Sequence, residues 1–148
     1  MRGMVYFAFV LLVLAGCQAT DNSADKQDYL DLTNQENSDK PISYWTENYS
    51  PVPAFPISAA KKSLSGCVTL SVNINTHGKI DGYKVIHSYP GEVFVPSVLA
   101  ALKKWRWEPT KENLERVPAI QIVGLTLEIK DAKNKADFRK QCEAFVQS

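Results

Sequence analysis

Three cysteines and two histidines are the first side chains to consider as nucleophiles or metal ligands in this 148-residue chain. His77 lies in a predicted turn and His87 near the far end of the predicted strand that follows, so the two cannot share a metal ion. Cys67 and His87 fall on strands that we expect to pair, which would suit a thiolate nucleophile beside a base. Neither a glycine-rich phosphate loop nor an oxyanion-hole signature accompanies them. We therefore expect no catalytic activity, no bound metal and no cofactor.

The N-terminal segment that ends at Cys17 is typical of an export signal. Arg2 gives it a basic start, and Val5–Leu14 is an unbroken apolar run. A helix needs about 20 apolar residues to cross a bilayer, so this shorter run favours the core of a signal peptide over a membrane anchor. We predict that residues 1–16 are the signal peptide.

The end of this segment, Leu14–Cys17, resembles the lipobox of bacterial lipoproteins, which implies cleavage before Cys17 and acylation of that cysteine. Acyl chains hold a protein on a membrane because each buried CH₂ group contributes about 0.8 kcal/mol. Gln18 stands where an aspartate would resemble an inner-membrane retention signal. We therefore expect a lipid anchor in the outer membrane of a Gram-negative bacterium, facing the periplasm. The alternative is a chance cysteine after a transmembrane segment.

Cys67 and Cys142 are the thiols that remain once Cys17 is acylated, and the expected compartment is oxidising. We predict that they form a disulfide, which would contribute roughly 4–5 kcal/mol by the chain-entropy estimate. The alternative is a pair of buried free thiols. The bond would hold a C-terminal helix, predicted within residues 131–148 and capped by Asp131, on the first strand. The apolar face of this helix consists of Phe138, Cys142 and Phe145.

The apolar pattern predicts three strands. Residues alternate between apolar and polar over Cys67–Asn75, as in a strand with one buried face. A turn and a second strand over Ile80–Ser88 follow, and Gly82 indicates a bulge in it. A third strand is predicted over Val117–Lys130, with a second bulge at Gly124, where the apolar parity changes.

Two helices are predicted before the third strand, over Ile57–Leu64 and from Val95 to Trp105. Together with the strands they give an α+β domain over residues 55–130, a three-stranded antiparallel sheet packed by helices. We expect Ile57, Ala60 and Leu64 to face the core from the first helix. The core-facing stripe of the second consists of Val95, Val98, Leu99, Leu102 and Trp105.

Residues 17–54 are predicted to tether this domain to the membrane. Gln18–Lys40 is acidic and polar, so it has too little apolar surface to order itself, apart from a short helical turn expected around Tyr29–Leu32. The aromatic segment Pro41–Tyr49 is different, because its rings would be costly to leave in water. It either covers the edge of the core or forms a contact patch for a partner.

The charge balance argues against nucleic acid as a partner. The chain has 17 basic and 16 acidic residues, so it has no global positive field. A local basic cluster of Lys103, Lys104 and Arg106 follows the second helix. It is interpreted as a helix-end stabiliser, with a binding patch as the alternative.

The length of the third strand indicates how a partner could bind to it. An edge strand presents unpaired N–H and C=O groups, and soluble proteins normally blunt such edges. A long edge without proline after Pro118 can accept an extended peptide by strand addition.

The domain resembles the C-terminal domain of the TonB energy-transducer family over about 75 residues, from 55 to 130. The helix that ends in Trp-x-aromatic-x-Pro is the most specific part of the resemblance. Val95 and Val98 depart from the family pattern, which usually has an acidic and a small residue there. The matching residues are Phe55, Pro56, Ala59, Gly66, Val68, Gly78, Val85, Ser88, Leu99, Ala101, Leu102, Trp105 and Pro109.

This resemblance implies a domain that adds a short extended segment of an outer-membrane transporter as a strand at the edge of its sheet. Carried over to this chain, the implied binding residues lie on the third strand and are Ile120, Ile122, Gly124, Leu125, Leu127 and Ile129.

The resemblance does not extend to the N-terminal half of the family's full-length members. Its full-length members carry an inner-membrane helix with a histidine that engages a proton-driven motor, whereas this chain carries the expected lipobox. One hypothesis is therefore a lipid-anchored, peptide-binding accessory to transport, whose partner is a transporter segment or another envelope protein. The other is a structural envelope lipoprotein that packs against its own aromatic segment or against a second copy as a homodimer. An edge already paired by the chain's own residues would favour the second.

Overall fold

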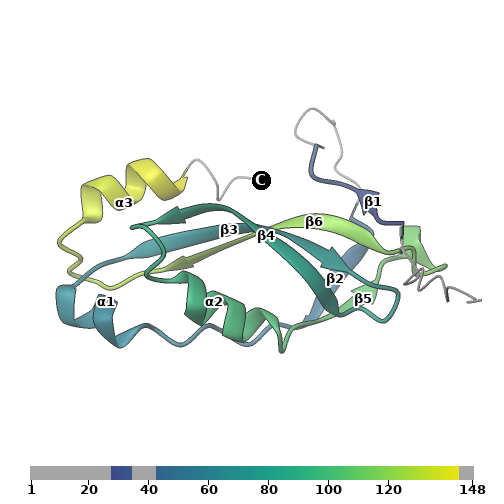
Figure 1. Cartoon of the computed structure of the whole chain (residues 1–148), viewed down its shortest axis with the longest axis horizontal. Coiled ribbons are helices and arrows are strands. Elements are labelled where there is room, and N and C mark those ends of the chain that lie inside the picture. The colour runs from purple at the N-terminus through teal and green to yellow at the C-terminus, as the bar shows by residue number, and fades with distance from the viewer. Residues whose placement is uncertain (1–27, 35–42, 144–148) are drawn as a thin grey trace, which may run out of the picture.

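A computed structural model describes residues 28–34 and 43–143 as two sheets and three α-helices. The larger sheet has the order β1-β6-β3-β4, in which β6, β3 and β4 are antiparallel and β1 is parallel to β6. The predicted α+β architecture around a three-stranded antiparallel sheet is confirmed (Figure 1). The strands of this sheet are β1 (Leu30–Asp31), β3 (Gly66–Ile74), β4 (Ile80–Tyr89) and β6 (Ala119–Leu127).

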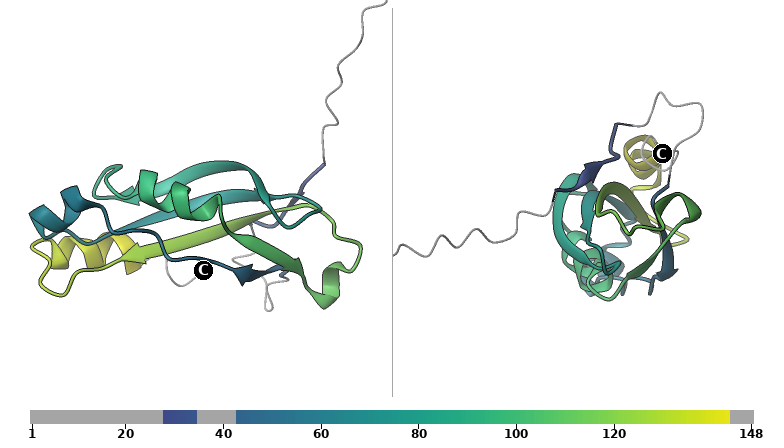
Figure 2. Two further views of the ribbon diagram at one scale, coloured as in Figure 1. Left: turned by 90° about the horizontal axis from the view of Figure 1, so that it is seen from below. Right: turned by 90° about the vertical axis from the view of Figure 1, so that its right-hand side faces the viewer.

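A second, two-stranded sheet pairs β2 (Trp45–Tyr49) with β5 (Arg106–Pro109). Helices α1 (Ile57–Lys62) and α2 (Val95–Leu102) lie on one face of the larger sheet, and α3 (Lys135–Cys142) lies on the other (Figure 1). A short 3₁₀ helix, Lys111–Asn113, precedes β6. Seen end-on, the larger sheet curls around the core (Figure 2).

Strand β3 forms the centre of the core. Its alternating residues Val68, Leu70, Val72 and Ile74 are all 0% exposed, as the sequence pattern predicts. The core that they share with α1 and α2 is closed by large aromatic side chains, namely Trp45, Phe94, Trp105 and Trp107.

The register of the strands confirms one predicted bulge and contradicts the other. Between β3 and β4 the register shifts after Asn73, beside Gly82, as predicted, and shifts again after Thr69. Between β3 and β6 it is continuous, so the bulge predicted at Gly124 is wrong, and β6 is shorter than predicted at both ends. The parity change in the sequence arises because β6 has apolar residues on both faces. Ala119, Val123, Leu125 and Leu127 face the core, and Ile120 and Ile122 lie half-buried on the other face.

Both early helices differ in detail from the prediction. The predicted inward face is wrong for Ile57, which is 74% exposed, and for the exposed Ala60, whereas Leu64 packs on the core as predicted and Ala59 is fully buried. The helix is under two turns long, and the small side chain of Ala59 lets its backbone approach the core. Helix α2 ends at Leu102, short of the expected Trp105. The Trp105 indole is nevertheless buried and donates a hydrogen bond from Nε1 to the Pro51 carbonyl at 3.1 Å.

Two parts of the expected tether pair with the domain. Leu30 and Asp31 form β1, so the helical turn predicted there is wrong; Leu32 packs on the core from the end of this strand. Further along, Trp45 is 1% exposed, and its Nε1 donates to the Val117 carbonyl at 2.9 Å. The aromatic segment therefore covers the core at Trp45, as the first interpretation predicts, while Tyr49 stays 57% exposed.

Strand β1 is short because a local turn ends it. The Asp31 carboxylate accepts hydrogen bonds from the Thr33 backbone N–H at 2.9 Å and from its hydroxyl at 2.7 Å, which turns the chain away from β6. These two bonds hold the pKa of the Asp31 carboxyl below its usual value. Before the strand, the Tyr29 hydroxyl hydrogen-bonds Asp81 on β4, and burial together with this bond raises the pKa of Tyr29.

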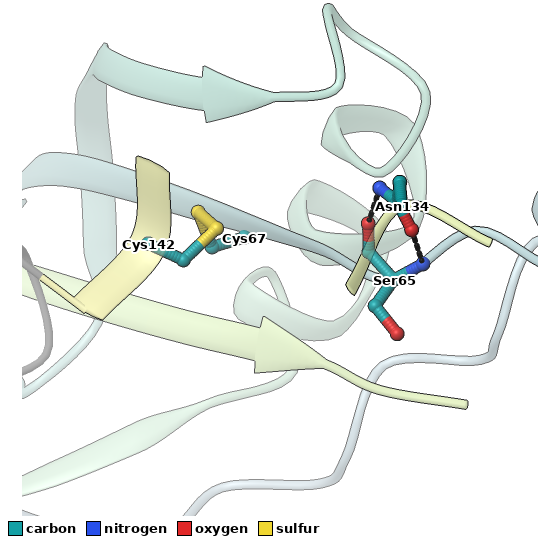
Figure 3. The surroundings of a disulfide bond; sticks show 4 residues. All are labelled: Ser65, Cys67, Asn134 and Cys142. Atoms are coloured by element: carbon teal, nitrogen blue, oxygen red, sulfur yellow. Dashed lines mark hydrogen bonds between the residues drawn. A yellow bond between two sulfur atoms is a disulfide. The ribbon is translucent and has the colours of Figure 1, made fainter. Parts of the chain in front are cut away.

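Helix α3 is held to the start of β3. The predicted Cys67–Cys142 disulfide is confirmed, with an S–S distance of 2.07 Å (Figure 3). The Asn134 side chain accepts from the Ser65 N–H at 3.0 Å and donates to the Ser65 carbonyl at 2.9 Å. The helix begins after Asn134, so the expected cap at Asp131 is wrong. Residues 1–27, including the predicted signal peptide and Cys17, and Phe145 lie outside the described residues.

The hairpin turn between β3 and β4 depends on Gly78. Its φ is +69°, and a Cβ there would lie 2.0 Å from the Trp107 carbonyl oxygen. The Gly78 carbonyl also accepts a hydrogen bond from the Trp107 N–H at 2.9 Å, which joins the turn to β5. Gly91 has a similar φ of +52°, but a Cβ there would meet nothing within 4 Å.

We expect Gly78→Ala to lower the free energy of unfolding by about 3 kcal/mol, because alanine is strained in the left-handed region and also overlaps Trp107. Gly91→Ala shares the backbone strain without the overlap and should cost only about 1 kcal/mol. Urea unfolding of the two variants measures the difference. Equal losses would show that the contact with β5 does not constrain the turn.

The turn after β1 should respond to acid. Because the pKa of Asp31 is lowered in the folded chain, its contribution is present above the ordinary aspartate pKa and is lost as the pH falls through the lowered value. Thr33→Val removes the hydroxyl donor and should raise the pKa of Asp31 towards its usual value, as followed by NMR titration of the carboxyl carbon. An unchanged titration midpoint would contradict the turn.

Candidate functional site

Strand β6 is paired along its whole length on one side and only at its start on the other. On the second side, the carbonyls of Pro118 and Ile120 accept hydrogen bonds from the N–H groups of Leu30 and Leu32 at 2.9 and 3.0 Å. The register of β1 extends no further than Ile120. In the part of the chain that the structure describes, no strand pairs with β6 on this side beyond that residue.

The orientation of the free backbone groups follows from the geometry of a strand. Both polar backbone groups of one residue point to the same side, and the side alternates along the chain. Because the Pro118 and Ile120 carbonyls face β1, the N–H and C=O groups of Ile122, Gly124 and Thr126 face the same way. We call the backbone of these three residues the open edge.

The open edge overlaps only partly with the binding residues expected from the sequence. Ile122 and Gly124 belong to it, whereas the Ile120 carbonyl is already bonded to Leu32. Leu125 and Leu127 alternate with the residues of the open edge, so their backbone groups face β3, and the Leu127 side chain is buried.

Ile129 lies beyond the end of β6 and is also unavailable, because its N–H donates to the Ser65 hydroxyl at 3.0 Å. Thr126 belongs to the open edge but is not among the binding residues predicted from the sequence. The prediction placed a bulge at Gly124, which changes the parity of the residues after it. Without that bulge, every second residue counted from Ile120 would have included Thr126.

The opposite edge of the sheet, β4, is less suited to accept a strand. Its two register shifts interrupt the ladder near Asp81 and Ile86, and bulges of this kind blunt an edge. The open edge of β6 lies in a continuous register instead. It is therefore the candidate site for strand addition.

The residues first considered for catalysis do not converge. His77 is exposed in the hairpin turn, where its N–H donates to the Asn75 side chain at 3.0 Å. His87 lies opposite Thr69, and the Cys67 sulfur is part of the disulfide, so the two cannot form a nucleophile and base pair. Among residues 28–34 and 43–143, no group of three or more potential metal ligands is present. No helix within these ranges has the length and apolarity to cross a membrane.

The chain is similar in sequence to proteins of one known family. The model of the family "Gram-negative bacterial TonB protein C-terminal" matches residues 51–125. The chain is 35% identical over 57 residues to protein TonB of Pseudomonas aeruginosa, and 27% identical over 59 residues to protein TonB of Escherichia coli K12. These alignments cover 38% and 40% of this chain but only 17% and 25% of the two TonB proteins.

Two solved structures are also similar. The solution structure of the Pseudomonas aeruginosa TonB C-terminal domain has 26% identity and a TM-score of 0.49, and the match covers 61% of this chain and 91% of that one. The TonB2 protein of Vibrio anguillarum has 24% identity and a TM-score of 0.45, with 85% and 100% covered. Domains of the TonB family interact with outer-membrane transporters and other proteins of the Gram-negative envelope. The family match spans half of the sequence, and this chain belongs to the TonB C-terminal family.

Proposed function

We propose that this protein is a lipid-anchored, non-catalytic binding module of the periplasm that captures an extended segment of an outer-membrane transporter at the open edge. The observation that carries the proposal is the row of outward-facing backbone groups at Ile122, Gly124 and Thr126, beside a register that is otherwise continuous. Strand addition uses backbone hydrogen bonds for affinity and side-chain alternation for specificity.

The size of the open edge sets the strength of such binding. A backbone hydrogen bond contributes about 1 kcal/mol net, so three outward residues provide roughly 3–6 kcal/mol, part of which is offset by ordering the segment. This corresponds to dissociation constants in about the millimolar range. Contact with the open edge alone is therefore transient.

A lipid anchor at Cys17 would compensate for this low affinity by concentrating the module at the membrane. Because β1 is docked on the domain, the chain between Cys17 and Leu30 spans at most about 45 Å when fully extended. The accessory role follows from this anchor, which differs from the inner-membrane helix through which energy-transducing family members engage a motor.

A structural or self-associating envelope lipoprotein is the second candidate, and one observation favours it. The start of the β6 edge is paired with the chain's own β1 at Ala119 and Ile120. If further residues of the same chain, or of a second copy, complete this pairing, the edge is not available to a transporter.

Replacing Ile122 by proline tests the two functions against each other. This change removes an N–H that faces the open edge while leaving the neighbouring bonds from Gln121 and Val123 to β3 in place. We expect about a fivefold loss of affinity for synthetic peptides copied from periplasmic transporter segments, because one backbone hydrogen bond of about 1 kcal/mol is lost. Fluorescence anisotropy measures binding, and circular dichroism confirms folding.

Ile86→Pro is the matched control, because it places a proline at a bulged position of the opposite edge strand and should leave binding intact. Leu127, although predicted from the sequence as a binding residue, is unsuitable because its side chain is buried. Unchanged peptide binding by a folded Ile122→Pro variant would contradict the open-edge proposal.

The anchor has its own test. Cys17→Ala should abolish incorporation of radiolabelled palmitate, because the thiol that would be acylated is gone. Cys142→Ala also removes one thiol but should leave palmitate labelling unchanged. Undiminished palmitate labelling of the Cys17→Ala protein would contradict lipid anchoring at this residue.

A further inference from the structure

A cavity of about 210 Å³ opens where β6 ends, between the residues that follow the strand and helix α3. Glu128 and Lys130 line it from the β6 side, and Lys135, Phe138 and Arg139 line it from α3. Phe138 is buried, whereas the three cationic side chains are exposed. We call this the basic cavity.

The helical period of α3 determines where two of the cations, Lys135 and Arg139, lie. Phe138 and Cys142, four residues apart, face the sheet, and the disulfide fixes the helix in that rotation. Lys135 and Arg139 are also four residues apart, so both lie on one adjacent side of the helix, above the end of β6. The position of these charges is therefore set by the same bond that holds α3 to β3 (Figure 3).

The basic cavity has an excess of positive charge. Three cations line it against one carboxylate, Glu128. Across the described ranges of the chain, none of these three cations forms a salt bridge. A group with negative charge would therefore be favoured in the cavity.

The cavity lies at one defined end of the open edge. Strand β6 runs from Ala119 to Leu127, and Lys130 follows three residues later, within about 10 Å of the end of the strand. Helix α3 packs on β3 and β4, and the residues that follow β6 line the cavity together with it. An added strand that follows the open edge past Thr126 therefore reaches the cavity.

The direction of such a strand is indicated by β1. This strand occupies the start of the same side of β6 and runs parallel to it, with Leu30 opposite Ala119 and Asp31 opposite Ile120. A segment that continues along this side in the same direction has its C-terminal end beside the basic cavity.

We propose that the basic cavity receives acidic side chains of the partner segment through Lys130, Lys135 and Arg139, at the C-terminal end of the segment, where it continues past Thr126. This inference rests on the proposed function and specifies the chemistry of the partner. A cluster of surface cations could instead serve a membrane, but the cavity is hollowed, is lined by the buried Phe138 and lies just after the end of β6, which favours a peptide.

Three synthetic peptides of alternating threonine and valine, blocked at both ends, test this proposal with the full chain. One carries two aspartates at its C-terminal end, one carries them at its N-terminal end, and one carries asparagines at the C-terminal end. Exposed ion pairs are weak and screened by salt, so we expect the first peptide to bind about fivefold more tightly than the other two at low salt. This advantage should fall as salt is added.

The Lys135→Glu/Arg139→Glu variant should abolish the advantage. Its matched control is Lys133→Glu/Lys140→Glu, which changes the net charge equally near the same helix but lies outside the cavity lining and should retain the advantage. Tighter binding of the peptide with N-terminal aspartates would overturn the parallel direction. An advantage that survives in the Lys135→Glu/Arg139→Glu variant, or that the control variant also loses, would overturn the role of the cavity.

These outcomes are separate from the failure of the proposed function. If all three peptides bind equally and Ile122→Pro abolishes their binding, the open edge is a binding site and the inference about acidic partners is wrong. If none binds at millimolar concentration, both proposals are wrong. Binding of free phosphate with the same dependence on Lys135 and Arg139, without a preference among the peptides, would also overturn the inference.

Discussion

The two-sided pairing of β3 is the constraint on which the rest of this structure depends. Strand β3 is hydrogen-bonded to β4 on one side and to β6 on the other, and its inward side chains form the middle of the core. Because β3 occupies one side of β6 completely, the other side of β6 remains as an edge. The candidate site is thus a direct consequence of how the central strand is placed, and its geometry is as rigid as the sheet.

The first residues of β3 join the sheet to the helices on both of its faces. At Gly66 a Cβ would lie 2.2 Å from both the Phe94 ring and the Tyr89 carbonyl oxygen, so glycine allows the segment leading into α2 to pack directly on the strand. Phe94 in turn meets Phe55 edge to face, with ring centroids 5.6 Å apart. On the other face, Ser65 and Cys67 hold α3 through the Asn134 side chain and the disulfide. These contacts fix the end of the sheet at which the basic cavity forms.

Predictions from the sequence are correct where one residue pattern is compatible with only one structure. The period of two in β3, the core stripe of α2 and the pairing of Cys67 with Cys142 are predicted correctly, because burial on one face or the count of available thiols decides each of them. The candidate site is predicted less completely. Its strand and two of its three residues, Ile122 and Gly124, follow from the sequence, but Thr126 does not.

The structural features that were not predicted from the sequence depend on contacts between distant segments of the chain. Strand β1 has two residues, too few for any periodic pattern, and it exists because Leu30 and Leu32 find acceptors on Pro118 and Ile120. The inward face of α1 depends on the path of the chain around Ala59 rather than on its apolar residues, since Ile57 remains exposed. Likewise, β6 has apolar residues on both faces, which gives the same change of parity in the sequence as a bulge would. The continuous register with β3 shows that no bulge is present in β6.

Amide hydrogen exchange at the open edge, followed by NMR on the full chain, tests the central claim most directly. The amides of Ile122, Gly124 and Thr126 should exchange quickly in the free protein, while those of Gln121, Val123 and Leu125 are protected by β3. On addition of a transporter-derived peptide, the three fast amides should become protected. Slow exchange at these three amides in the free protein would contradict the account, because the edge would then already be paired.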